Sequence, residues 1–142
     1  MIEQQKMIER VRQLCREDRR LVAALMYGSF TRGEGDAYSD IEFALFFRDE
    51  AHEEVDPREW VSRIAPVEMY FVNEFGNGTA IFSNLVRGEF HFDNASDMRL
   101  VEGWKDTAWF PSLESAILVD RTGELTRLLQ PFTRPPQYDT PE

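Results

Sequence analysis

The sequence predicts a single α/β (α+β) domain, because segments with helical periodicity alternate along the chain with short apolar runs that are typical of strands. A chain of 142 residues is long enough for one hydrophobic core and short for two ordinary domains. Since 42% of the residues are apolar and 13% are aromatic, there is ample side-chain volume to bury. We therefore expect one compact, folded domain.

Helices are expected at residues 2–17, from Pro57 to the residue before Pro66, and at 123–130. In the first of these, apolar side chains recur on one face and include Cys15, which we expect to be a buried, unreactive thiol. Asp56 and Pro57 are typical of a helix start, with an acidic cap followed by proline at the first helical position.

Strands are expected at residues 21–27, 40–47, 67–73, 79–82, 88–93 and 116–119. The second strand becomes wholly apolar toward its end, which predicts a central position in the sheet. Four of the seven prolines fall within residues 131–142, a composition typical of a linker. The sequence therefore predicts a domain at 1–130 followed by a Pro-rich tail.

Charge and hydropathy exclude several classes of protein. The chain carries 26 acidic and 16 basic residues, and a net charge of −10 would repel nucleic acid. Its apolar runs are far shorter than the ~20 residues that a membrane span needs, so no membrane association is expected. The single cysteine and the absence of an N-terminal apolar stretch predict a cytoplasmic protein.

The stretch GSFTRGEGDAYSDIE, residues 28–42, carries the first candidate site. Asp40 and Glu42 are two residues apart on a predicted strand, so both side chains point to the same face. Carboxylates are the ligands that Mg²⁺ prefers, together with substrate phosphates. A solvated strand end is the simpler interpretation for an isolated Asp-x-Glu, and the neighbouring motifs argue against it here.

Two further motifs complete the pattern. Gly28 and Ser29 close the preceding strand with a turn whose amides and hydroxyl can donate to phosphate oxygens. A hairpin-like return would bring this turn to the same end of the sheet as Asp40. In the segment GEFHFD, Glu89 alternates with Phe90, so it points into a cleft if the phenylalanine packs inward.

Together these motifs resemble the nucleotidyltransferase superfamily with the DNA polymerase β-like palm fold. The stretches MYGSFTRGEGDAYSDIEF and NLVRGEFHF are similar to the N-terminal catalytic domain of the Lin(B)-type lincosamide nucleotidyltransferases. The resemblance implies a mixed β-sheet flanked by helices, two Mg²⁺ ions held by Asp40 and Glu42, and ATP phosphates on the turn at Gly28 and Ser29. It places Glu89 as the general base, with a partial role as a metal ligand.

The implied reaction is transfer of AMP from ATP to a hydroxyl group of a small-molecule antibiotic. Arg32 and Ser39 are secondary candidates for nucleotide binding, whereas the orientation of Arg87 depends on where its strand begins and its role stays open. The family continues into a C-terminal helical domain, which would begin at the Pro-rich tail. A homodimer is compatible with the resemblance.

Two alternative functions stay open at this stage. A short nucleotidyltransferase of the antitoxin type would transfer AMP to a partner protein instead of a small molecule. A module that binds nucleotide without turnover would use the same turn and carboxylates. Zinc is not expected, because the only histidines are His91 and His52, and His52 lies in a charged, loop-like stretch.

Overall fold

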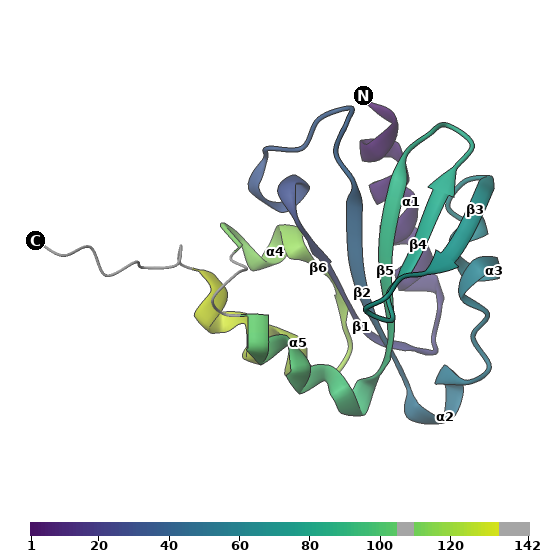
Figure 1. The fold of residues 1–142 in the computed structure, drawn as a ribbon. Helices are drawn as coiled ribbons and strands as arrows, with labels where there is room; N and C mark the ends of the chain where they lie inside the picture. The colour runs from purple at the N-terminus through teal and green to yellow at the C-terminus, as the bar shows by residue number, and fades with distance from the viewer. Residues whose placement is uncertain (105–109, 134–142) are drawn as a thin grey trace, which may run out of the picture.

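The computed structural model describes residues 1–104 and 110–133, which form an α+β domain around one six-stranded mixed sheet (Figure 1). The strands are β1 (Leu21–Tyr27), β2 (Ile41–Phe47), β3 (Val67–Val72), β4 (Gly78–Phe82), β5 (Arg87–Asn94) and β6 (Ile117–Asp120). The α-helices are α1 (Glu3–Glu17), α2 (Asp49–His52), α3 (Pro57–Ser62), α4 (Leu113–Ala116) and α5 (Glu124–Leu129). Three 3₁₀ segments are η1 (Ser29–Arg32), η2 (Ala95–Trp104) and η3 (Gln130–Thr133).

The strand order is β3-β4-β5-β2-β1-β6. β2 and β5 run parallel, and every other pair of neighbours is antiparallel. The central position predicted for β2 is confirmed, since it lies between β5 and β1 and six of its seven residues are buried. The antiparallel return from β1 to β2 brings the end of β1 beside the start of β2, which is where the candidate motifs lie.

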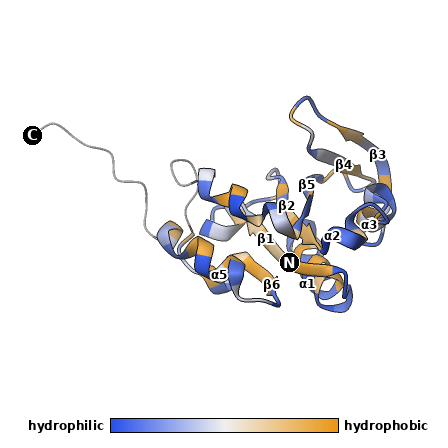
Figure 2. Ribbon diagram, turned by 90° about the horizontal axis from the view of Figure 1, so that it is seen from below, coloured by the Kyte–Doolittle hydropathy of each residue, from blue (hydrophilic) through white to orange (hydrophobic). Residues whose placement is uncertain are grey.

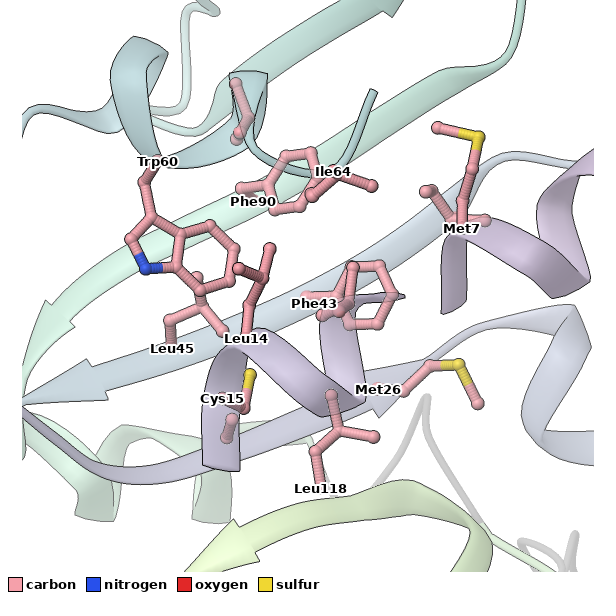
Figure 3. Close-up of a cluster of buried hydrophobic side chains, with 14 of the residues drawn as sticks. Met7, Leu14, Cys15, Met26, Phe43, Leu45, Trp60, Ile64, Phe90 and Leu118 are labelled. Carbon is pink, nitrogen blue, oxygen red and sulfur yellow. The ribbon is translucent and has the colours of Figure 1, made fainter. Parts of the chain in front are cut away.

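Each face of the sheet carries its own apolar cluster. Helices α1 and α3 cover one face, where the cluster includes Leu14, Phe43, Trp60 and Phe90 (Figure 3). Segments η2, α5 and η3 cover part of the other face, around Phe46 and Met98. Figure 2 shows these two groups of helical elements on opposite sides of the sheet. Burial of each such aromatic side chain contributes roughly 2 kcal/mol, so both clusters stabilise the fold.

The local signals read from the sequence account for α1 and α3. The apolar face expected for α1 is buried, and it consists of Met7, Ile8, Val11, Leu14 and Cys15. Burial is the chief reason that the pKa of the Cys15 thiol is raised to about 12. Asp56 caps α3 by accepting a hydrogen bond from the Glu59 amide at 3.3 Å, with Pro57 at the first helical position.

Other element boundaries differ from the prediction. Residue 116 belongs to α4, and the last strand is Ile117–Asp120. At the end of this strand the Asp120 carboxylate accepts hydrogen bonds from the amides of Gly123 and Thr126, and these bonds fix the first turn of α5. The packed domain also continues past residue 130, since Phe132 of η3 is buried against Phe110. Residues 134–142, most of the predicted tail, lie outside the described part of the chain.

None of the helices in the described ranges is both long enough and apolar enough to cross a membrane.

One polar contact fixes α3 against the start of β1. The Asp18 carboxylate accepts hydrogen bonds from the Arg20 guanidinium at 2.9 and 2.7 Å and from the Trp60 indole at 3.1 Å. Burial alone would raise the pKa of Asp18, but these hydrogen bonds outweigh burial and lower it. The ionised form therefore stabilises the fold, and this contribution is lost as the pH falls through the lowered pKa.

We expect Asp18→Ala to reduce the free energy of unfolding by about 2 kcal/mol at pH 7, because it leaves the Trp60 indole and Arg20 without their acceptor. Urea denaturation measures the change, and Glu17→Ala, which removes only an exposed contact with Gln13, is the matched control with an effect below about 0.5 kcal/mol. Equal losses in the two variants would contradict the assignment. The difference in free energy of unfolding between Asp18→Ala and Glu17→Ala should become smaller below pH 4.

Candidate active site

The register of the sheet places four polar side chains in a row on one face. Tyr27 of β1 pairs with Glu42 of β2, Glu42 pairs with Glu89 of β5, and Glu89 pairs with Thr79 of β4. Register partners on neighbouring strands share a face and lie close together. We call Tyr27, Glu42, Glu89 and Thr79 the polar row.

The polar row lies on the same face as η2 and α5, but beyond the part that they bury. Along β2, the side chains of Glu42, Ala44 and Phe46 share this face, as alternation predicts. Ala44 and Phe46 are buried in the cluster under η2 and α5, whereas Glu42 is partly exposed. The carboxyl group therefore sits where an apolar face meets solvent, which is a suitable position for binding a charged ligand.

The turn at Gly28 lies directly against Glu42. Gly28 has φ +88° and ψ −165°, a conformation that is essentially restricted to glycine. A Cβ atom at this position would collide with the Glu42 carboxylate oxygen. The turn is closed by Thr31, whose amide and hydroxyl donate to the Gly28 carbonyl at 3.1 and 2.6 Å. The backbone after β1 and the first carboxyl of β2 are thus in contact.

Burial and neighbouring acids raise the pKa of Glu42 to about 7. Burial is the largest cause, followed by the negative charges of Glu89 and Asp40, and a hydrogen bond with the Glu89 carboxyl acts in the same direction. The charge of Arg32 acts in the opposite direction. A carboxyl group that holds its proton up to about pH 7 beside a second carboxyl group forms a site where a cation can replace that proton.

Asp40 lies immediately before β2 rather than within it, and its carboxylate faces Arg87, with the Arg87 Nε 3.9 Å from Asp40 Oδ2. β5 begins at Arg87, so this side chain shares the face of Glu89, two residues later. Within residues 1–104 and 110–133, no three His, Cys, Asp or Glu side chains surround a common point where a metal ion would fit. Glu42 and Glu89 are the adjacent pair of oxygen donors.

The secondary nucleotide candidates lie in the loop between β1 and β2. Arg32 forms an ion pair with Glu34, at 3.3 Å between Nε and Oε2. The positive charge of Arg32 also acts on Glu42, where it opposes the rise in pKa. The Ser39 hydroxyl donates to the Asp36 carboxylate at 3.0 Å and so holds the loop in shape. The Ser29 carbonyl accepts from the Glu34 amide at 3.0 Å, which closes the turn after Gly28.

Tyr27 and His91 are members of the site region that sequence reasoning did not assign. Their rings meet edge to face with centroids 5.7 Å apart. Burial raises the pKa of Tyr27, and the charges of Glu42 and Glu89 add to this effect, so the phenol stays protonated. Burial also lowers the pKa of His91, which favours the neutral imidazole. The position of Tyr27, one residue before Gly28, was the sequence signal that could have identified it.

Thr79 was also missed. It is fully buried, and its hydroxyl is the single buried side-chain polar atom without a hydrogen-bond partner among the described residues. A buried hydroxyl without a partner is costly, so this group calls for an explanation, of which a role in a functional site is one. No signal in the sequence marks it, because its importance comes only from the pairing of β4 with β5.

Comparison with known proteins adds no relative to this picture. No protein-family model matches the sequence, and no curated protein matches it significantly. The resemblance to nucleotidyltransferases therefore rests on the motifs themselves.

Proposed function

We propose that the protein is a nucleotidyltransferase of the polymerase β-like palm fold that uses Mg²⁺ and ATP to transfer AMP to a hydroxyl group of a small molecule, with a lincosamide antibiotic as the first acceptor to test. The observation that carries the proposal is the contact between the glycine turn and a partly buried carboxyl pair. Gly28 lies against Glu42, and Glu42 lies beside Glu89 on the neighbouring strand.

The donor set suits Mg²⁺. Asp40, Glu42 and Glu89 offer only carboxylate oxygens, which hard cations prefer. The raised pKa of Glu42 reflects burial first and the charges of Glu89 and Asp40 second, and a bound cation would compensate for both. Paired metal ions in such sites neutralise phosphate charge and stabilise the entering and leaving oxygens. In this protein Asp40 and Glu42 would hold the two ions, with Glu89 as a third, weaker ligand.

The chain's own groups then have distinct roles. The backbone amides after Gly28 and the hydroxyl of Ser29 donate to phosphate oxygens, and Arg32 adds positive charge beside them. Glu89 accepts the proton of the acceptor hydroxyl while the oxygen of that hydroxyl forms a bond to the α-phosphorus. The bond from that phosphorus to the bridging oxygen breaks, so pyrophosphate leaves and AMP stays on the acceptor.

A direct test incubates the protein with Mg-ATP and a panel of lincosamides and aminoglycosides, and searches by mass spectrometry for a product heavier by one AMP. We expect a product with the wild type and at least a 100-fold loss of rate with Asp40→Asn, because the substitution removes a metal ligand. Calorimetric titration with Mg-ATP should show correspondingly weaker binding. Nucleotide binding that ignores the substitution would argue against a metal site at Asp40.

A second candidate, transfer of AMP to a partner protein, is favoured by the edge of the sheet. β3 lies at one edge of the sheet (Figure 1). Its side chains Met69, Phe71 and Val72 are exposed. Exposed apolar strands at a sheet edge are common sites of protein association. Radiolabelled AMP appearing on a protein, and on no small molecule, would decide for this candidate. Binding of Mg-ATP with no transfer at all would instead indicate a nucleotide-binding module.

A further inference from the structure

Thr79 lies at the end of the polar row, and its hydroxyl has no hydrogen-bond partner within residues 1–104 and 110–133. β4 runs beside β5 (Figure 1), and the register places Thr79 directly across from Glu89. On its other side Thr79 pairs with Phe71 of β3, and Ile81 follows it on the same face of β4. Phe71 and Ile81 have no polar side-chain atoms, so Glu89 is the neighbour of these three that can accept from the hydroxyl.

The Thr79 hydroxyl is unfavourable in its present surroundings. The residue has no exposed surface, so bulk water does not replace the missing partner. Valine has nearly the same shape without the hydroxyl and also favours strands, so it would suit a purely structural position better. The threonine is therefore explained by a hydrogen bond that its hydroxyl makes in another state of the site.

The Glu89 carboxyl is engaged with a different partner. It forms a hydrogen bond with the carboxyl of Glu42 on the neighbouring strand. Because β5 lies between β2 and β4, the Glu89 side chain can reach Glu42 on one side or Thr79 on the other. The Cβ atoms of directly opposed residues in antiparallel strands are about 5 Å apart, a gap that a glutamate and a hydroxyl can bridge without backbone movement.

Binding of a cation would change which of the two partners Glu89 has. A hydrogen bond between two carboxyl groups needs a proton, and ionised carboxylates have only acceptor atoms. With Glu42 and Glu89 both ionised around a cation, the bond between them is lost and Glu89 can accept from another donor. In the described part of the chain, the Thr79 hydroxyl is the buried side-chain donor that lacks a partner.

We propose that Thr79 is a positioning residue for Glu89, whose carboxylate accepts a hydrogen bond from the Thr79 hydroxyl once the site holds a cation. The inference rests on the proposed nucleotidyl transfer, in which Glu89 is the general base. With one oxygen held by Thr79, the carboxylate cannot rotate freely, and its other oxygen stays available for the proton of the acceptor hydroxyl. The same hydroxyl makes the metal-free protein less stable, so it couples stability to metal binding.

The first test is urea denaturation of the wild type and Thr79→Val, with and without millimolar Mg²⁺. In metal-free buffer Thr79→Val should lower the equilibrium constant for unfolding about fivefold, because it removes an unpaired buried hydroxyl. In Mg²⁺ this advantage should disappear or reverse. An advantage that is the same in both buffers, or no advantage in metal-free buffer, would overturn the inference.

Thr126→Val is the matched control for the urea experiment. The Thr126 hydroxyl already donates to the Asp120 carboxylate at 2.7 Å, so its removal should destabilise the protein. Because this pair lies at the start of α5, away from the polar row, the loss should be the same with and without Mg²⁺. A loss that changes with Mg²⁺ as much as the effect of Thr79→Val would show that the Mg²⁺ response is general, and would overturn the inference.

Kinetics of AMP transfer separate positioning from a structural role. Thr79→Val should lower kcat at least tenfold and change the KM for ATP less than twofold, because the nucleotide is held by the turn at Gly28 and not by Thr79. Thr79→Ser keeps the hydroxyl and loses only a methyl group, so its kcat should stay within about threefold of the wild type. Equal values of kcat for the serine and valine variants would overturn the inference.

Failure of this inference and failure of the proposed function give different results. If Mg²⁺ stabilises the wild type and Thr79→Val by the same factor, the metal site stands and Thr79 does not act on Glu89. If the advantage of Thr79→Val disappears in Mg²⁺ but no acceptor receives AMP, the hydroxyl serves a metal site and nucleotidyl transfer is rejected. If Mg²⁺ stabilises neither protein, the metal site and this inference are rejected together.

Discussion

Replacing Glu42 by glutamine is expected to abolish AMP transfer and, at the same time, to stabilise the protein above pH 7. The carboxylate is the central ligand in the proposed metal site, so its loss should lower the rate by about 1,000-fold or more, equivalent to ~4 kcal/mol in the barrier. In the absence of metal, however, the same group is a partly buried acid beside Glu89, and its charged form is unfavourable.

The direction of the pH effect follows from the raised pKa of Glu42. The pKa is about 7 in the folded protein, against an ordinary value of 4.5. Between these values the folded state retains a proton that the unfolded state has released, so stability falls as the pH rises from about 4.5 to 7. Glutamine cannot ionise. Because Glu42 is partly exposed, solvent screening reduces the full effect of this pKa shift, and the variant should match the wild type below pH 4.5 and exceed its free energy of unfolding by on the order of 2 kcal/mol at pH 8.

Urea denaturation at a series of pH values, without added metal, measures this difference. Glu50→Gln is the matched control, because Glu50 is exposed and pairs loosely with Arg48 at 3.8 Å, and its stability should follow the wild type at every pH. Millimolar Mg²⁺ should reduce the advantage of the glutamine variant, since bound metal favours the ionised Glu42 of the wild type. A glutamine variant that is less stable than the wild type at pH 8 would refute this account of the carboxyl pair.

The parts of the site that lie along one segment could be predicted from the sequence. Gly28 and Glu42 are joined by one short connection between two apolar strands, and the antiparallel return of β1 and β2 follows from that pattern. The inward packing of Phe90 and the opposite orientation of Glu89 likewise follow from strict alternation along one strand. These predictions needed only the period of the strand and the length of the loop.

The parts that depend on pairing between distant strands could not be predicted from local patterns, and only the family resemblance implied that Glu89 joins Glu42 in one site. Glu42 and Glu89 are neighbours because β2 and β5 are parallel in one particular register, and nothing local specifies that register. Thr79 joins the polar row for the same reason. The orientation of Arg87 depended on a strand boundary, which is the least certain feature of a local pattern. The apolar residues of η2 have a short 3₁₀ spacing that resembles neither a strand nor a long helix.

Gly28→Ala is the second substitution with a large expected effect. The backbone conformation of Gly28 is restricted to glycine, and any other residue in this conformation costs about 1–3 kcal/mol. The added Cβ would also displace the Glu42 carboxyl group. We therefore expect the free energy of unfolding to fall by about 3 kcal/mol, together with loss of nucleotide binding. Gly33→Ala is the matched control, because Gly33 also has positive φ, +71°, but a Cβ there would meet open space. Gly33→Ala should therefore lower the free energy of unfolding by only about 1 kcal/mol.

A double-mutant cycle separates backbone strain from the collision. In a Glu42→Ala background the carboxyl group is gone, and the remaining Cβ of residue 42 would lie 3.8 Å from the added methyl group, an ordinary contact. Gly28→Ala should then cost at least 1 kcal/mol less than it does in the wild type, whereas Gly33→Ala should cost the same in both backgrounds. Urea denaturation of the six proteins measures these terms. If the effects of Gly28→Ala and Glu42→Ala are simply additive, the turn does not position Glu42, and the packing of the glycine turn against the carboxyl pair loses its place in the mechanism.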